Sequence, residues 1–135
     1  MINSYINTSK TVATDAAIPF DNNSIYTNCL ITHDEGSTSF KINKPGYYMV
    51  VFNGDATNAT GNIQVELFYN NNSVAGAEAS STAGELTDII NLKFSTIIKV
   101  LPNCPISGVS QNLSFINSGV EATFTNANVI IKKIC

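Results

Sequence analysis

Residues 45–52, which read PGYYMVVF, constrain the fold of this chain more than any other segment. Pro45 fixes φ and Gly46 permits a positive φ, so the pair predicts a turn, and the aromatic and β-branched residues that follow favour a buried strand. Side chains alternate between the two faces of a strand. One face would carry Tyr48, Val50 and Phe52, and the other Tyr47, Met49 and Val51. Because both faces are apolar, we expect a second sheet, a neighbouring subunit or both to cover them.

The rest of the chain repeats short alternating segments that are separated by turns. Alternation with a period of two predicts strands, and no segment shows a convincing helical period. The expected strands cover residues 11–14, 25–32, 39–43, 62–69, 88–101, 112–116 and 122–134. Residues 74–79, which are small, predict a weak edge strand or a place of close approach. Residues 21–24 read as a turn, and residues 55–61 and 80–85 as loops. This pattern predicts an all-β antiparallel sandwich.

Composition limits the partners that the chain can have. Its 135 residues fit one domain, and charged residues make up only 13%, about half the usual share. The net charge is −3 and the lysines are scattered, which argues against binding to nucleic acid or to an anionic membrane. No run is long and apolar enough to span a membrane, and the polar residues 1–9 show no signal peptide.

The strand at residues 45–52 also carries a family resemblance. Its Pro-Gly-x-Tyr-x-Val-x-Phe pattern, formed by Pro45, Gly46, Tyr48, Val50 and Phe52, resembles the C1q/tumour-necrosis-factor superfamily. The last strand is similar too, with Phe124, a polar break at residues 126–128 and an apolar run at residues 129–131. The resemblance implies an antiparallel jelly-roll β-sandwich of about ten strands over residues 1–135, assembled as a tight homotrimer.

This resemblance supplies the expected trimer or core residues, which are Tyr47, Tyr48, Val50, Phe52, Phe124 and Ile130. Which face of the strand meets the trimer axis stays open. Residues 1–9 are expected to be either flexible or packed in the trimer. The chain departs from collagen-stalked relatives because it has no Gly-x-y repeat.

The chain most resembles bacterial and phage members of the superfamily, such as the heads of collagen-like spore-surface glycoproteins. This implies a non-catalytic homotrimer on a phage or bacterial surface structure, which mediates assembly and interaction with a protein or a host surface. The expected location is extracellular or on a particle, and other coat or virion proteins are expected partners. The alternative is a lectin-like adhesin that recognises glycans through its loops.

The residues themselves argue against an enzyme. Nucleophilic catalysis needs a nucleophile, a base and a group that orients the base. The single histidine, His33, sits in a polar turn beside Asp34 and Glu35, which predicts a surface loop. The carboxylates fall in predicted loops or on predicted wet strand faces, where they are expected to be solvated.

The residues offer two candidate ligand sites. No cofactor is expected, and the alternative is calcium, with Asp34, Glu35 and Asp55 as candidate ligands, although no Asp-x-Asp-x-Asp pattern is present. A glycan could meet the polar loop formed by Asn70, Asn71 and Asn72 next to Tyr69. Tyr69 itself is expected to belong to the core face of its strand.

The three cysteines are Cys29, Cys104 and Cys135, and the odd number leaves at least one thiol without an intrachain partner. Buried or unpaired thiols are the favoured interpretation. Jelly-roll connectivity, which comes from the resemblance, places the regions of Cys104 and Cys135 at the same end of the sandwich. A disulfide between these two is therefore a further hypothesis.

Overall fold

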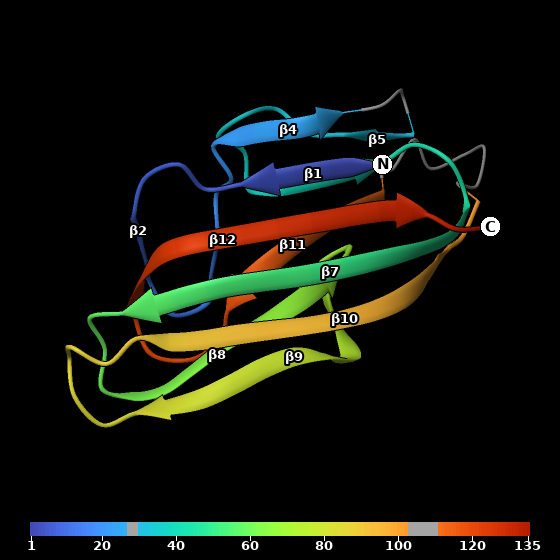
Figure 1. The fold of residues 1–135 in the computed structure, drawn as a ribbon. Coiled ribbons are helices and arrows are strands. Elements are labelled where there is room, and N and C mark those ends of the chain that lie inside the picture. The colour runs from blue at the N-terminus through green and yellow to red at the C-terminus, as the bar shows by residue number, and fades with distance from the viewer. Residues whose placement is uncertain (27–29, 103–110) are drawn as a thin grey trace.

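The computed structural model describes residues 1–26, 30–102 and 111–135, which form two antiparallel sheets packed face to face (Figure 1). The described residues contain twelve strands and no helix. Their bounds are β1 Ile2–Tyr5, β2 Lys10–Val12, β3 Ala16–Ala17, β4 Asn22–Tyr26, β5 Ile31–Thr32, β6 Ser39–Ile42, β7 Gly46–Thr57, β8 Gly61–Tyr69, β9 Asn72–Ala83, β10 Ile90–Val100, β11 Gln111–Asn117 and β12 Ala122–Lys133. The all-β antiparallel sandwich is confirmed.

Each sheet has six strands among the described residues. Sheet A has the order β10-β7-β12-β1-β4, with β2 also paired to β12. Sheet B has the order β5-β6-β11-β8-β9, with β3 also paired to β11. Strand β7 lies between β10 and β12 along most of its length (Figure 1). The Pro-Gly segment therefore opens a central strand, as its composition predicts.

The core lies between the two sheets and is rich in aromatic rings. Tyr48, Val50 and Phe52 of β7 are fully buried. The ring of Phe52 stacks on Phe115 of sheet B with centroids 5.5 Å apart. Phe115 also meets the edge of Phe40, with centroids 6.0 Å apart. Contacts of this kind stabilise the sandwich beyond simple burial of apolar area.

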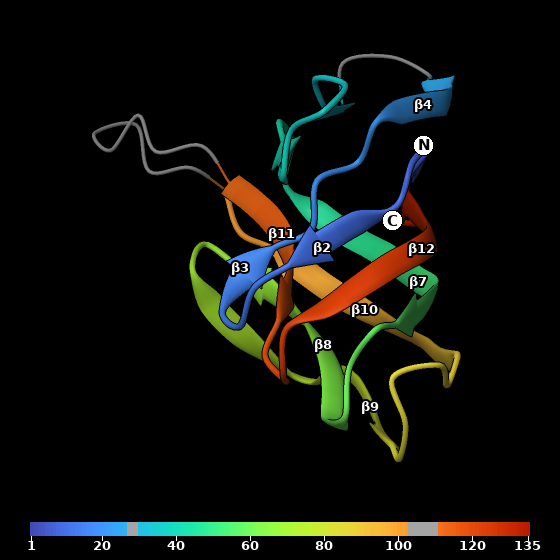
Figure 2. The ribbon, with the colours of Figure 1, turned by 90° about the vertical axis from the view of Figure 1, so that its left-hand side faces the viewer.

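The two chain ends lie at one end of the sandwich, which we call the terminal end (Figure 1). There the N–H of Ile134 donates to the carbonyl of Tyr47 (2.9 Å), so the last residues pack beside the start of β7. The opposite end, which we call the distal end, carries the turns at residues 58–60 and 84–89 and faces the viewer in Figure 2. These two turns are joined by the N–H of Asn58, which donates to the carbonyl of Leu86 (3.0 Å).

Several boundaries differ from the sequence prediction because long-range pairing extends polar segments. Strand β4 occupies the expected turn at residues 21–24, since its backbone pairs with β1. Strand β7 continues through Thr57 and β9 through Ala83, where loops were expected. In each case a neighbouring strand satisfies the backbone N–H and C=O groups, which outweighs the low strand preference of Asn, Ser and Gly.

The start of the chain, residues 1–9, was expected to be either flexible or packed in the trimer. Residues Ile2–Tyr5 form β1, which pairs with both β12 and β4. Ile2 is fully buried. The flexible alternative is therefore wrong for this stretch, while packing in a trimer stays a prediction. Residues 27–29, which were expected to continue a strand over residues 25–32, lie outside the described residues.

Candidate functional site

The two faces of β7 have different surroundings. Tyr48, Val50 and Phe52 point into the sandwich. The hydroxyl of Tyr48 donates to the carbonyl of Lys44 (2.7 Å), and burial raises the pKa of this phenol. Tyr47, which precedes Tyr48 and lies on the other face of β7, is 43% exposed. The outward face of β7 is thus the one that the second sheet leaves uncovered.

The outward side chains of sheet A form a contiguous apolar surface, which we call the apolar face. Its members are Tyr47, Met49 and Val51 of β7, Ile97 of β10 and Ile130 of β12. The strand register sets Ile97 opposite Met49, and Ile130 opposite Val51. Ile97 is 59% exposed although it lies in the middle of a strand. An apolar face of this kind on a sheet that is otherwise solvated is a candidate interaction surface.

A shallow hollow of about 360 Å³ deepens the apolar face between β7 and β10. Val51, Asn53, Lys93 and Ser95 line it together with the two neighbouring phenylalanines. The small Ser95 lies opposite Val51, which leaves space above the sheet. Lys93 and Lys99 on β10 and Lys132 on β12 alternate in sequence with inward-facing residues, so they border the apolar face.

The structure divides the expected trimer or core residues between two places. Tyr48, Val50, Phe52 and Phe124 are fully buried inside the sandwich. Tyr47 and Ile130 lie on the outward side of sheet A. Ile97 was missed by the sequence analysis, although its odd-numbered position puts it on the same side as Lys93, Ser95 and Lys99. That shared parity is the signal that could have found it.

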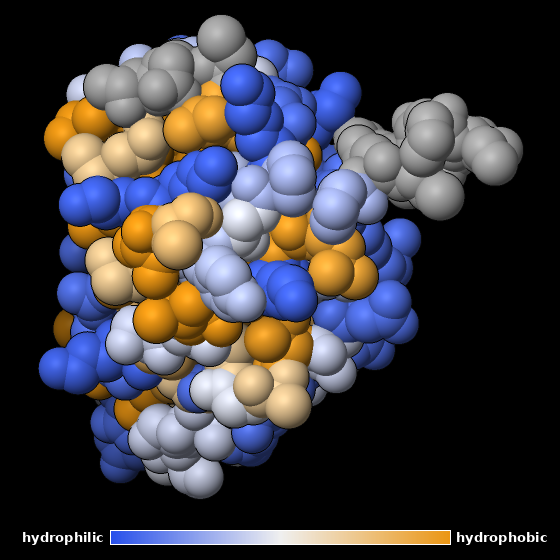
Figure 3. All heavy atoms as spheres, turned by 90° about the vertical axis from the view of Figure 1, so that its right-hand side faces the viewer, coloured by the Kyte–Doolittle hydropathy of each residue, from blue (hydrophilic) through white to orange (hydrophobic). Residues whose placement is uncertain are grey.

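Further apolar side chains are exposed at the terminal end, which Figure 3 views directly. They are Ile25, Tyr26, Leu101 and Ile134, each at least 40% exposed. Figure 3 shows hydrophobic side chains interspersed with hydrophilic ones over this end. This end is therefore a mixed surface.

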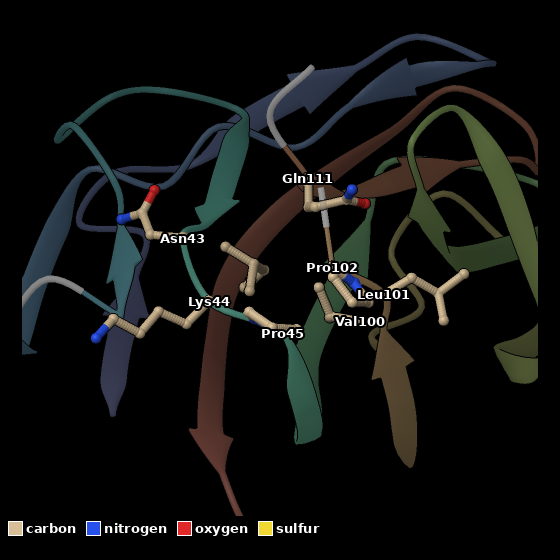
Figure 4. A pocket seen from close by; sticks show the side chains of 8 residues that line it. Asn43, Lys44, Pro45, Val100, Leu101, Pro102 and Gln111 are labelled. Atoms are coloured by element: carbon tan, nitrogen blue, oxygen red, sulfur yellow. The ribbon is translucent and has the colours of Figure 1, made fainter. Parts of the chain in front are cut away.

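A smaller hollow of about 240 Å³ opens at the terminal end (Figure 4). Its lining combines the apolar residues Ile42, Pro45, Val100, Leu101 and Pro102 with the polar residues Asn43, Lys44 and Gln111. In Figure 4 the Lys44 side chain extends away from Pro45 and Val100. Its volume is below the range of about 300–1,000 Å³ that is usual for ligand sites. Two of its lining residues, Pro102 and Gln111, flank in sequence residues 103–110, which are outside the described part of the chain.

The loop of three asparagines has a structural role at its first residue. Asn70 and Asn71 both have positive φ, 49° and 67°, and form the two-residue turn between β8 and β9. The Asn70 amide donates to Gln111 Oε1 (2.6 Å), and its Oδ1 accepts from the N–H of Asn112 (2.8 Å). Asn70 thus fastens the turn to β11, while Asn71 and Asn72 are exposed. A ligand-binding role for this loop stays a prediction.

Tyr69, beside this loop, is partly buried and packs against the hydrophobic core. Its hydroxyl bonds to Gln111 Oε1, which explains why the ring can lie at the edge of the core with its polar tip satisfied.

His33 does not lie in a surface loop, so that expectation was wrong. It is 5% exposed, and its ring stacks on Phe40 with centroids 4.2 Å apart. Nδ1 lies 2.8 Å from Asn23 Oδ1, and Nε2 lies 2.9 Å from the carbonyl oxygen of Ser37. Burial lowers the pKa of the imidazole. Both ring nitrogens are therefore engaged in holding the turn after β5, and the polarity of that turn concealed an apolar site for the ring.

The candidate calcium ligands are not brought together. Asp34, Glu35 and Asp55 do not meet as a group, and no cluster of three or more His, Cys, Asp or Glu side chains that could hold a metal ion occurs in the described part of the chain. Glu35 Oε1 instead accepts from the N–H of Asn23 (3.2 Å), and Asp55 Oδ1 accepts from the amide of Asn91 (2.8 Å). The calcium hypothesis fails on geometry for these residues.

One carboxylate is less solvated than expected. Glu66 of β8 is half-buried and lies directly opposite Glu78 of β9. Burial, followed by the hydrogen bond and like charge of Glu78, raises the pKa of Glu66. Cross-strand register creates this pair, and like charges placed directly opposite each other destabilise a sheet.

The cysteine hypothesis is not tested by the described residues. Cys135 is exposed at the end of the chain, next to the start of β7. Cys29 and Cys104 lie outside the described residues, so a disulfide between Cys104 and Cys135 stays a prediction.

Comparison with known proteins identifies the fold. No protein-family model matches the sequence, and no match is found among curated proteins. Solved structures do match, and the Eiger TNF of S. frugiperda superposes with a TM-score of 0.73 at 10% identity, covering 99% of this chain and 92% of that chain. The fold is a TNF-like jelly roll.

Two other structures agree with this assignment. Murine APRIL at pH 5.0 gives a TM-score of 0.66 at 5% identity, with 98% of each chain covered. The PRD1 vertex protein P5 gives 0.57 at 16% identity, covering 99% of this chain and 97% of that chain. At such low identity these likenesses establish the jelly-roll fold expected from the Pro-Gly strand. In the described residues, no helix is long and apolar enough to cross a membrane.

Proposed function

We propose that this protein is a non-catalytic homotrimeric domain of a phage or bacterial surface structure, where it mediates assembly and contact with a protein or a host surface. The observation that carries the proposal is the apolar face on the outward side of sheet A, in a chain with a TNF-like jelly-roll fold. The likeness to a vertex protein supports a setting on the surface of a particle.

The apolar face suits burial between copies of the chain. Its centre combines Met49, Val51 and Ile130, which are only half-buried in one protomer, with the well-exposed Ile97. Obligate interfaces are apolar at their centre and polar at the rim. The bordering lysines supply such a rim. Assembly would also account for a chain with only 13% charged residues, because part of its surface is removed from water.

The assembled state is tested by light scattering coupled to size-exclusion chromatography over a range of protein concentrations. A mass three times that of the 14.5 kDa chain, kept at micromolar concentration, is the expected result. A stable monomer at these concentrations would contradict the proposal, because the apolar face would then stay exposed to water.

A further inference from the structure

The outward side of sheet B carries a third hollow, separate from those on the apolar face and at the terminal end. It encloses about 320 Å³ and is lined by Asp15, Phe68, Asn71, Ser114 and Ile116. It lies on the opposite side of the sandwich from the apolar face, because β8 and β11 belong to sheet B. Its volume falls in the range of about 300–1,000 Å³ typical of sites for small molecules.

The strand register leaves an aromatic ring accessible in this hollow. Phe68 lies opposite Ser114 of β11 on one side and Ser73 of β9 on the other. A bulge between Glu66 and Phe68 interrupts the pairing of β8 with β9 at this point. Because both cross-strand neighbours of Phe68 are small, its ring is only half-buried and can offer a surface to a ligand.

The polar rim is held in place by two turns with unusual backbone angles. Asp15 has a φ of 65°, and its N–H donates to the carbonyl of Asn117 (2.7 Å). Asn71 has a φ of 67° and belongs to the tight β8–β9 turn, which Asn70 fastens to β11. Both side chains are therefore presented by backbone that is already fixed, which lowers the cost of ordering them on binding.

We propose that this hollow binds one ring of a neutral carbohydrate. The C–H face of a sugar ring would lie on Phe68 and beside Ile116. The Asp15 carboxylate accepts hydrogen bonds from sugar hydroxyls, the Asn71 amide both donates and accepts, and the Ser114 hydroxyl does the same. An apolar floor with a few convergent polar groups is the usual composition of a small-molecule site.

The charge of the site selects the kind of sugar. The hollow contains the Asp15 carboxylate, and Glu66 lies near enough for the charge of Asp15 to act on it. No lysine is among the residues that line it. Acidic sugars such as sialic acid would meet like charge here, so neutral hexoses and N-acetylhexosamines are the expected ligands.

This inference rests on the proposed role in surface interaction and names the ligand class. The two proposals use different residues on opposite sides of the sandwich. They can also fail separately. Light scattering reports on the trimer, while sugar binding is read residue by residue.

The test is a titration of ¹⁵N-labelled protein, followed by NMR, with the methyl glycosides of glucose, galactose, mannose and N-acetylglucosamine and with N-acetylneuraminic acid. We expect saturable shifts for at least one neutral sugar, centred on Phe68 and Ser114, and no saturation with the acid. Absence of saturable shifts for every neutral sugar would overturn the proposal. Shifts centred elsewhere, or equal binding of the acid, would overturn it as well.

Variants distinguish binding at this site from nonspecific binding of sugars to sheet B. Phe68→Ala should weaken binding about fivefold, since stacking on a ring is worth about 1 kcal/mol. Asp15→Asn keeps a residue that tolerates positive φ and alters an exposed side chain, so it provides a test even where Phe68→Ala fails to fold. Thr82→Ala, an exposed position on β9 near the distal end of sheet B, is the matched control and should bind normally. Undiminished binding by Asp15→Asn and Phe68→Ala would refute the assignment.

Discussion

Replacement of Ile97 by Asp is the most direct test of the apolar face. Ile97 is 59% exposed in one protomer, so this share of its side chain is available for burial between subunits. Complete burial of an isoleucine contributes about 1.5–3 kcal/mol, which leaves about 1–2 kcal/mol per protomer for assembly. Three equivalent positions sum to about 3–6 kcal/mol per trimer, and the cost of burying three carboxylates adds to this. The trimer should therefore dissociate at least about 10²- to 10⁴-fold more readily.

The assay is sedimentation equilibrium of wild type and Ile97→Asp at matched concentrations, with circular dichroism to show that the fold is kept. Leu86→Asp is the control, because Leu86 is 58% exposed but sits in the distal turn at residues 84–89, away from the apolar face. Wild type and Leu86→Asp should stay trimeric while Ile97→Asp dissociates. A trimer of unchanged strength in Ile97→Asp would refute the assignment of this face as the interface.

Three further predictions concern the fold itself. Tyr48→Asp places a carboxylate at a fully buried position and should abolish folding. Tyr48→Phe removes only the hydroxyl and should lower the free energy of unfolding, measured by chemical denaturation, by only about 1 kcal/mol. A soluble trimeric Tyr48→Asp would contradict the inward placement of Tyr48. Gly119→Ala sets a Cβ 2.3 Å from the carbonyl oxygen of Asn62 and should lower the free energy of unfolding by about 2–4 kcal/mol. In the control Gly84→Ala the nearest atom to the new Cβ is 3.7 Å away, so the melting temperature should change little. Equal effects of the two substitutions would refute the steric argument. The pKa of Glu66 in the folded protein is raised above its ordinary 4.5, so the folded protein binds more protons at this carboxyl than the unfolded chain does. The contribution of Glu66 to the free energy of unfolding is therefore complete below pH 4.5 and is lost as the pH rises through the raised pKa. Glu66→Gln should remove this loss of stability, so at pH 7 the variant should unfold at the same or a slightly higher denaturant concentration than wild type. The gain in the free energy of unfolding should be at most about 1 kcal/mol, and a large destabilisation would show that the carboxylate is needed.

Local alternation was enough to predict the fold class and the long strands. In residues 62–69 an apolar side chain recurs at every second position, and in residues 88–101 the same pattern is interrupted only by Thr96. Both segments are strands close to those bounds, β8 and β10. This works because the two-residue period of a strand depends only on neighbouring peptide units. The polar strands β4 and the end of β9 could not be predicted in this way, since their backbones are held by partners far away in the chain.

The candidate sites depended on tertiary structure to a greater degree. The sequence by itself determined that both faces of the Tyr47–Phe52 segment are apolar and need cover. Only the packing of sheet B decided that Tyr48 faces inward and Tyr47 outward, and only register placed Ile97 and Ile130 beside them. The same holds for His33, buried by Phe40, and for Phe68, which meets Asp15 across more than fifty residues of chain. Surfaces of this kind are made by strand pairing between distant segments, and the order of residues along one strand carries no record of its partners.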